Sequence, residues 1–210
     1  MTRERLAWTL LWTAIVYALG FYFIGAAIKP GYSQLSDFIS EYNATGTAWA
    51  CVLTYVGFAV MTVLLSIFLW LASSLVEARG LSRVGTWLLW AFPASYLIAV
   101  VAPCDAGCPV EGSNSQMLHN LLGVVTYFAM GVGVFLLGFH GRLKAYPLRR
   151  AYLWLTGLAF PIVFVLMVQP ELGDWAGLMQ RLLDLSMAVV FMLMLSTLIE
   201  RPNGAAGTSS

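Results

Sequence analysis

The stretch GTAWACVLTYVGFAVMTVLLSIFLWLASSL fills residues 46–75 without a single Asp, Glu, Lys or Arg, and Arg79 and Arg83 follow it closely. About 20 apolar residues in a helix are enough to cross the hydrocarbon core of a bilayer. A helix is expected because an unpaired backbone amide costs several kcal/mol there. Five further stretches of this kind flank it, and they cover residues 6–28, 84–102, 118–138, 151–168 and 178–199.

The composition agrees with a membrane-embedded chain. Apolar residues make up 60% of the sequence and charged residues only 10%, and the mean hydropathy is +0.81. Water-soluble domains rarely reach such values. We therefore expect an all-α fold, a single domain of six transmembrane helices over residues 1–201, followed by a disordered tail over 202–210. The net charge of +1 suggests no nucleic-acid partner, and membrane lipids are the expected surroundings.

The charges between the spans predict the orientation. Basic residues concentrate before span one and after spans two, four and six: Arg3, Arg5, Arg79, Arg83, Arg142, Lys144, Arg149, Arg150 and Arg201. The other connections are mainly acidic: Asp37, Glu41, Asp105, Glu111, Glu171 and Asp174. Positive connections usually stay in the cytoplasm. The pattern predicts a multi-pass protein of the cell membrane with both termini cytoplasmic.

The first acidic connection has the pattern of a short amphipathic helix. Leu35, Phe38, Ile39 and Tyr42 follow the spacing i, i+3, i+4, i+7. Ser36 and Ser40 form one i, i+4 pair, and Asp37 and Glu41 form another. We expect a short extracytoplasmic interfacial helix. Its polar face is either solvated at the membrane surface or forms a wall over a cavity between the spans.

The second acidic connection carries Cys104 and Cys108 on either side of Asp105. Outside the cytoplasm, two cysteines so close together favour a disulfide-closed loop. A metal pair is the alternative, but no second Cys or His pair has the spacing of a structural zinc site, so we expect no metal. Cys51 lies inside span two and is expected to be a small buried side chain.

Two ionisable groups open spans four and six. His119 begins span four beside Asn120, where it could act as a base, a proton relay, a ligand or an interfacial hydrogen-bonding group. Arg181 and Asp184 are three residues apart in span six and are expected to pair, with each other or with a carboxylate from the loops. Alternatively, Arg181 holds an anionic lipid head group or a phosphate. His140, at the basic end, is expected to be structural.

Several short motifs resemble the domain of unknown function 998 family, whose members are six-helix membrane proteins, mainly from bacteria and archaea. They are Tyr-Ser…Ile-Ser-Glu after span one, Pro-Cys-Asp…Cys-Pro after span three, His119-Asn120 and Gln180-Arg181. The resemblance covers nearly the whole chain. It implies the architecture and a candidate site of Ser36, Ser40, Glu41, Cys104, Asp105, Cys108, His119 and Arg181. It implies no particular reaction.

The first functional hypothesis is an intramembrane hydrolase or transferase that acts on a lipid or another amphiphile. Ser36 or Ser40 would be the nucleophile, His119 the base and Asp105 the group that orients it. Alternatively, His119, Asp105 and Glu41 would hold a metal-activated water. The chain has only two histidines, which argues against zinc. We therefore expect no cofactor.

Two other classes of function stay open. The protein could bind or transport a lipid or small molecule, with Arg181, Gln180 and Asn120 as the binding residues. Charges near the bilayer midplane would be the mark of a transporter, and the spans hold almost none. The third possibility is a structural membrane subunit in which the polar cluster only ties the loops together.

Overall fold

A computed structural model describes residues 1–199 of the chain. These residues contain six helical spans of membrane-crossing length and no β-strand, which confirms the all-α fold. The spans are α1 (Arg3–Ile28); α2 (Ala50–Val52), η2 (Leu53–Ala59) and α3 (Val60–Leu75); α4 (Leu81–Leu88) and α5 (Ala91–Val101); α6 (Asn114–Leu137); α7 (Pro147–Met167); and η4 (Pro170–Trp175), α8 (Ala176–Leu193) and η5 (Met194–Leu198). The tail over 202–210 lies outside the described residues.

Local signals extend several helices beyond the apolar stretches. The side chain of Thr2 caps α1, and Ser113 caps α6 by accepting a hydrogen bond from the Gln116 amide at 3.2 Å. Pro147 occupies the first turn of α7, where its missing N–H costs nothing. In the third span, α4 and α5 are separate helices, and the break lies just before Pro93, which cannot donate to the preceding turn.

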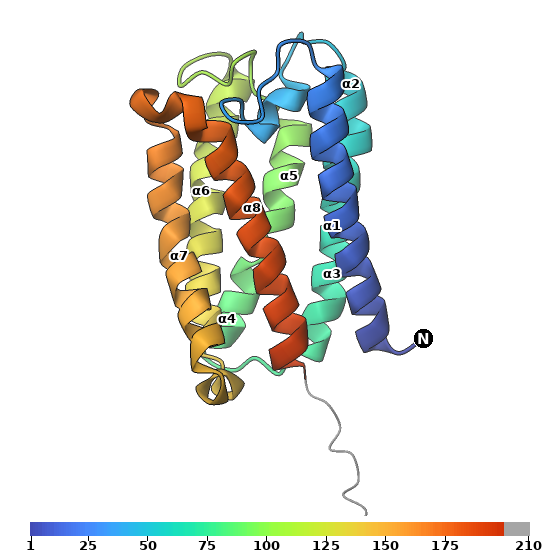
Figure 1. Cartoon of the computed structure of the whole chain (residues 1–210), viewed down its shortest axis with the longest axis vertical. Coiled ribbons are helices and arrows are strands. Elements are labelled where there is room, and N and C mark those ends of the chain that lie inside the picture. The colour runs from blue at the N-terminus through green and yellow to red at the C-terminus, as the bar shows by residue number, and fades with distance from the viewer. Residues whose placement is uncertain (200–210) are drawn as a thin grey trace, which may run out of the picture.

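The helices pack as a ring in the order α1, α3, α5, α6, α7 and α8, with α4 below α5 (Figure 1). At Gly85, a β-carbon would lie 2.6 Å from the Leu137 amide nitrogen, so glycine allows α4 to approach α6 closely. Contacts between α1 and α8 are sparse, although these helices are neighbours in the ring. The ring is therefore loosest between the first and last spans.

An aromatic series forms much of the buried core between α1 and α8. It runs through edge-to-face and tilted contacts from Phe21 to Phe58, Tyr96, Phe92 and Phe191. Aromatic rings bury large apolar areas and favour such edge-to-face and offset arrangements.

The expectation that Cys51 is buried is wrong, because its side chain is exposed. Hydropathy alone does not tell which face of an apolar helix is turned outward.

The connections over 29–49, 102–113 and 168–175 gather at one end of the bundle, which we call the loop end. The N-terminus and the last described residues lie at the opposite end (Figure 1). The even number of spans thus brings both ends of the described chain to the same side.

The expected amphipathic helix at the loop end is not confirmed. Only Ile39–Asn43 is helical, as a short 3-10 helix (η1), and the residues before it form turns. Ser33 Oγ accepts hydrogen bonds from the backbone amides of Leu35 and Ser36, and Asp37 accepts one from the Ser33 amide at 2.8 Å. Such side-chain bonds replace the helical ladder. Ile39 and Tyr42 consequently pack inside the bundle instead of lying on its surface.

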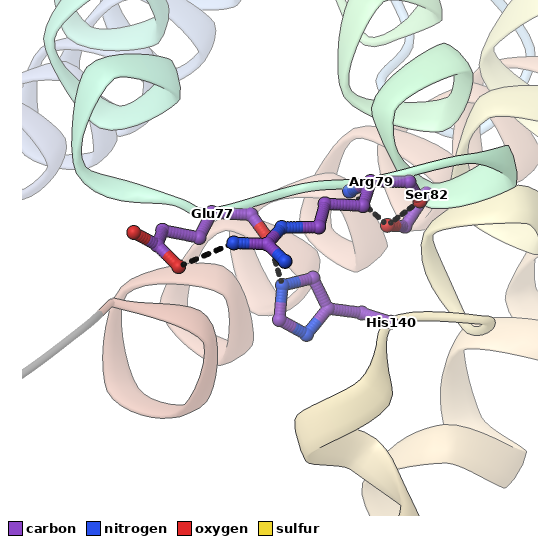
Figure 2. Close-up of polar contacts among 4 residues, drawn as sticks. All are labelled: Glu77, Arg79, Ser82 and His140. Atoms are coloured by element: carbon purple, nitrogen blue, oxygen red, sulfur yellow. Dashed lines mark hydrogen bonds and ion pairs between the residues drawn. The ribbon is translucent and has the colours of Figure 1, made fainter.

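At the opposite end, His140 joins two connections (Figure 2). Its Nε2 lies 3.2 Å from the carbonyl oxygen of Glu77, and its Nδ1 accepts a hydrogen bond from the Arg142 amide. A carbonyl can only accept, so the proton is on Nε2. Burial lowers the pKa of His140, which favours this neutral form. Nearby, Arg79 pairs with Glu77 at 3.7 Å on the surface.

Candidate functional site

A groove of about 240 Å³ lies between α1 and α8, and we call it the α1–α8 groove. Its walls are largely aliphatic and aromatic: Leu11, Ala14, Ile15, Ala18, Leu19 and Phe23 from α1, Leu182, Leu185, Ala188 and Phe191 from α8, and Met61, Leu65 and Phe92 beneath. Leu19, Phe23, Leu182 and Leu185 are each about half exposed. The groove therefore opens sideways, toward the space that lipid occupies around a membrane protein.

Polar groups occupy only the part of the groove nearest the loop end. Asp184 Oδ2 accepts hydrogen bonds from the hydroxyls of Tyr22 and Tyr96, the latter at 2.8 Å. The two hydroxyls are 2.6 Å apart. Eight residues separate Asp184 from the start of α8, which places it about 12 Å along the helix. A carboxyl group at such depth needs partners, and the two tyrosines provide them.

Arg181 lies at the same end but does not pair with Asp184. Its Nη1 donates to the carbonyl oxygens of Gln34, Asp37 and Gly177 at 2.8–3.1 Å. Its Nη2 donates to the hydroxyls of Tyr32 and Tyr42. Among the described residues no carboxylate binds this guanidinium, so the expected ion pair is wrong. Carbonyl and hydroxyl oxygens take the donors instead, and they fasten the loop segment before η1 to α8.

A second cavity of about 60 Å³, the polar cavity, lies behind Asp184. Polar side chains contribute much of its lining: Ser40, Ser95, Tyr96, His119, Thr126, Tyr127, Gln180 and Asp184. Tyr96 and Asp184 line both spaces and so form the partition between groove and cavity. A polar space of this volume has room for water molecules.

His119 is half-buried on α6 and lines the polar cavity. Its Nδ1 lies 2.7 Å from the carbonyl oxygen of Ala102, which is left without a helical partner where α5 ends. Nδ1 therefore carries the proton and Nε2 holds a lone pair. Nε2 has no hydrogen-bond partner among the described residues. It is also not among their fully buried side-chain nitrogen and oxygen atoms that lack a partner, so it is accessible. In its neutral form this histidine can therefore accept a proton at Nε2.

The disulfide between Cys104 and Cys108 forms as predicted, and it supports one wall of the polar cavity. Ser40 is buried, and its Oγ lies 3.3 Å from Cys108 Sγ. The carbonyl oxygen of Cys104 accepts a hydrogen bond from the Thr45 amide at 2.8 Å. The closed loop thus holds η1 in place on both sides.

Gln180 on α8 connects η1 with α6. Its Oε1 accepts from the Ile39 amide at 2.6 Å, and its Nε2 donates to the Tyr127 hydroxyl at 3.1 Å. The amide therefore fixes the start of η1 relative to α6 and α8. It is the only one of the three predicted binding residues that lines the polar cavity, since Arg181 lines the groove and Asn120 lines neither.

Asp105 and Asn120 organise the disulfide loop and do not meet His119. Asp105 accepts two hydrogen bonds from Ser113, from its amide and its hydroxyl, each at 2.8 Å. Asn120 donates to the carbonyl oxygens of Pro109 and Val110. The geometry therefore lacks the Asp105–His119 contact that the predicted catalytic arrangement needs. The carboxylate lies beside the helix N-terminus, where amides are free to donate.

Ser36 and Glu41 also stay outside both spaces. Ser36 Oγ donates to Asp37 at 3.0 Å, and Glu41 Oε1 accepts from the Phe38 amide at 3.0 Å. Burial raises the pKa of Glu41. Lys29 donates to the Glu41 carbonyl and to Thr47, and burial lowers the pKa of Lys29. These groups hold the loop end together.

The geometry thus brings together Ser40, His119 and Gln180 from the predicted set, with Asp184 and two tyrosines that were not in it. Asp184 could have been chosen from sequence, because an ionisable residue inside an apolar span is a functional candidate by default. Tyr22 and Tyr96 give no such signal among many aromatic residues. Within residues 1–199, no three His, Cys, Asp or Glu side chains gather as a metal site would require.

The family model described as Protein of unknown function (DUF998) matches residues 12–197, which confirms the resemblance seen in the loop motifs. No curated protein and no solved structure matches the chain.

Proposed function

Given that the chain belongs to the DUF998 family, we propose that it is a membrane protein that binds a single-chain amphiphile in the α1–α8 groove. The observation that carries this proposal is the division of the groove into a long apolar part and a polar end at Asp184, Tyr22 and Tyr96. A molecule that matches it has one apolar chain and one compact polar head.

The size and opening of the groove support this choice. Pockets for drug-sized ligands usually have about 300–1,000 Å³. A space of about 240 Å³ suits one narrow chain better than a two-chain lipid. The stretch of α1 from Leu11 to Phe23 that lines it is about 18 Å long. The half-exposed rim would admit the chain from the bilayer without passage through water.

The orientation is part of the proposal. The loop end would face away from the cytoplasm of the cell membrane, with the N- and C-termini on the cytoplasmic side. The alternating charges of the connections and the Cys104–Cys108 disulfide support this, since disulfides persist in oxidising compartments. The amphiphile would then come from the outer leaflet.

A photoreactive fatty alcohol with a diazirine in its chain tests the proposal in phosphatidylcholine vesicles. Ala188→Trp fills the groove from α8, and we expect it to lower labelling at least tenfold. Leu158→Trp enlarges an exposed residue on α7 and should leave labelling unchanged. Equal labelling of both variants and the unchanged protein would overturn the proposed site.

A second candidate function is hydrolysis of an acyl ester of that amphiphile. It is favoured by His119, whose Nε2 lone pair belongs to a residue of the polar cavity directly behind Asp184. His119 would take a proton from the attacking group, which is either a cavity water or the Ser40 hydroxyl. The ester C–O bond would break and release the alcohol. Water would supply the hydroxyl of the acid, either directly or by hydrolysing the acyl group on Ser40. Asp105, Ser36 and Glu41 would then support the loop and not the chemistry.

The ester hypothesis has its own test. A fatty-acyl ester of glycerol, incubated with the reconstituted protein, should release fatty acid, and His119→Gln should reduce release about a hundredfold. The matched control is His140→Gln at the opposite end. Amphiphile binding without any release by the unchanged protein would leave a binding protein and exclude the hydrolase.

A further inference from the structure

We infer that the head group held at Asp184 is a hydrogen-bond donor, an alcohol or a primary amine, and not a phosphate or a carboxylate. This inference rests on the proposed function, because it concerns the polar end of the same groove. The hydrogen bonds already made at that end decide which head group can bind there.

Only one of the two carboxyl oxygens of Asp184, the acceptor at the polar end, has hydrogen-bond partners. Asp184 Oδ2 takes the hydrogen bonds from Tyr22 and Tyr96. Oδ1 has no hydrogen-bond partner among the described residues. It is also not among their fully buried side-chain nitrogen and oxygen atoms that lack a partner, so it is accessible. It therefore opens onto the spaces that Asp184 lines. A carboxyl oxygen that lacks a partner in an apolar setting favours a ligand that donates to it.

The hydroxyl donors at the polar end are engaged. The tyrosine hydroxyls each have one proton, and both hydroxyls already lie within bonding distance of Oδ2 and of each other. They can still accept a hydrogen bond, but they have none left to give. A phosphate or carboxylate head, which only accepts when ionised, would thus find no donor in these two hydroxyls.

Arg181 would be the natural anion binder, but its geometry excludes this role. Three carbonyl oxygens occupy Nη1 and two tyrosine hydroxyls occupy Nη2. The remaining donor, Nε–H, has no partner but is fully buried. An anion could reach the guanidinium only after the loop segment had been released. Arg181 is therefore a positioning residue for that segment.

Gln34 is the remaining polar residue of the groove, and its side-chain amide is neutral. An amide can accept as well as donate, so it does not by itself favour an anion. The balance at the polar end therefore stays with acceptors. Each additional donor on the ligand, such as the three of an ammonium group, can use another oxygen of this set.

Competition against the photoreactive fatty alcohol tests the inference with probes of one chain length. We expect dodecanol and dodecylamine to displace the label at concentrations at least tenfold lower than dodecyl phosphate or dodecanoate. Asp184→Asn should weaken dodecanol and dodecylamine about tenfold. Glu111→Gln, which alters an exposed loop carboxylate, should change nothing.

The ranking in the unchanged protein needs no variant, so the test stands even if Asp184→Asn folds poorly. Equal or stronger displacement by the anionic probes would overturn the inference and leave the groove assigned. Labelling that no probe displaces and that Ala188→Trp does not alter would overturn the proposed function as well.

Discussion

The hydroxyl of Tyr96 donates to Oδ2 of Asp184 at 2.8 Å, and this bond connects α5 with α8 where the α1–α8 groove meets the polar cavity. The groove alone could be an ordinary defect between two helices. The shared partition supports the proposed binding site, because a head group in the groove would lie next to the polar cavity that His119 lines.

The first prediction concerns this partition. Tyr96→Phe removes the hydroxyl with little change in shape, so the free energy of unfolding should fall by about 1 kcal/mol, a typical value for a hydrogen bond between membrane helices. Binding of the fatty alcohol should weaken too. Thermal unfolding in detergent and photolabelling measure the two effects. Tyr55→Phe, at an exposed hydroxyl, is the control, and an equal response of both variants would refute the assigned role.

The second prediction concerns the loop segment that Arg181 holds. Arg181→Lys keeps the charge but cannot reach three carbonyls and two hydroxyls from one ammonium group. Amides over 32–43 should exchange hydrogen at least tenfold faster, as followed by mass spectrometry. Arg83→Lys changes an exposed arginine at the opposite end and should have no effect on this segment. Unchanged exchange in Arg181→Lys would contradict the positioning role.

The third prediction concerns the disulfide. It closes a loop with a sequence separation of 4, so chain entropy assigns it about 2 kcal/mol of stability. Cys104→Ala with Cys108→Ala should lower the melting temperature, and a reductant should lower that of the unchanged protein similarly. Cys51→Ala is the control, because this thiol is free and exposed. A reductant without effect on a protein shown by mass spectrometry to be reduced would speak against the stabilising role.

The fourth prediction concerns pH and His140. Burial lowers its pKa in the folded state below the value of about 6.5 expected in the unfolded chain. As the pH falls, the unfolded chain gains this proton first, so the free energy of unfolding decreases from about pH 6.5 down through the lowered pKa. Above that window His140 contributes no pH dependence. His140→Asn should therefore flatten the decline in melting temperature, and an unaltered decline would contradict the assignment.

Much of the fold follows from sequence for a simple reason. Hydrocarbon permits few backbone structures, so an uncharged stretch such as residues 46–75 can hardly be anything but a helix. The disulfide follows equally from spacing and compartment. Helix ends were less predictable, because caps such as Ser113 add turns that hydropathy does not register.

The candidate site was predicted only in part. Residue type and location drew attention to His119, Ser40 and Gln180, and the structure shows that all three line one cavity. The sequence could not tell that the side chains of Ser33 and Asp37 would bond to backbone amides in place of the expected helix. The free energies of these side-chain bonds and of the helical backbone bonds are close. Nor could it tell that backbone carbonyl oxygens would accept the hydrogen bonds of the Arg181 guanidinium. Pairings between distant spans, such as Tyr22 with Asp184, depend on the ring order of the helices.

The central claim is that the α1–α8 groove holds an apolar chain with its head at Asp184. An experimental structure in lipid nanodiscs supplied with dodecanol tests it most directly. The account predicts elongated density along Leu11 to Phe23 of α1, ending within hydrogen-bonding distance of Asp184 Oδ1. A groove closed by direct packing of α1 on α8, with chain density only around the outside of the bundle, would contradict it.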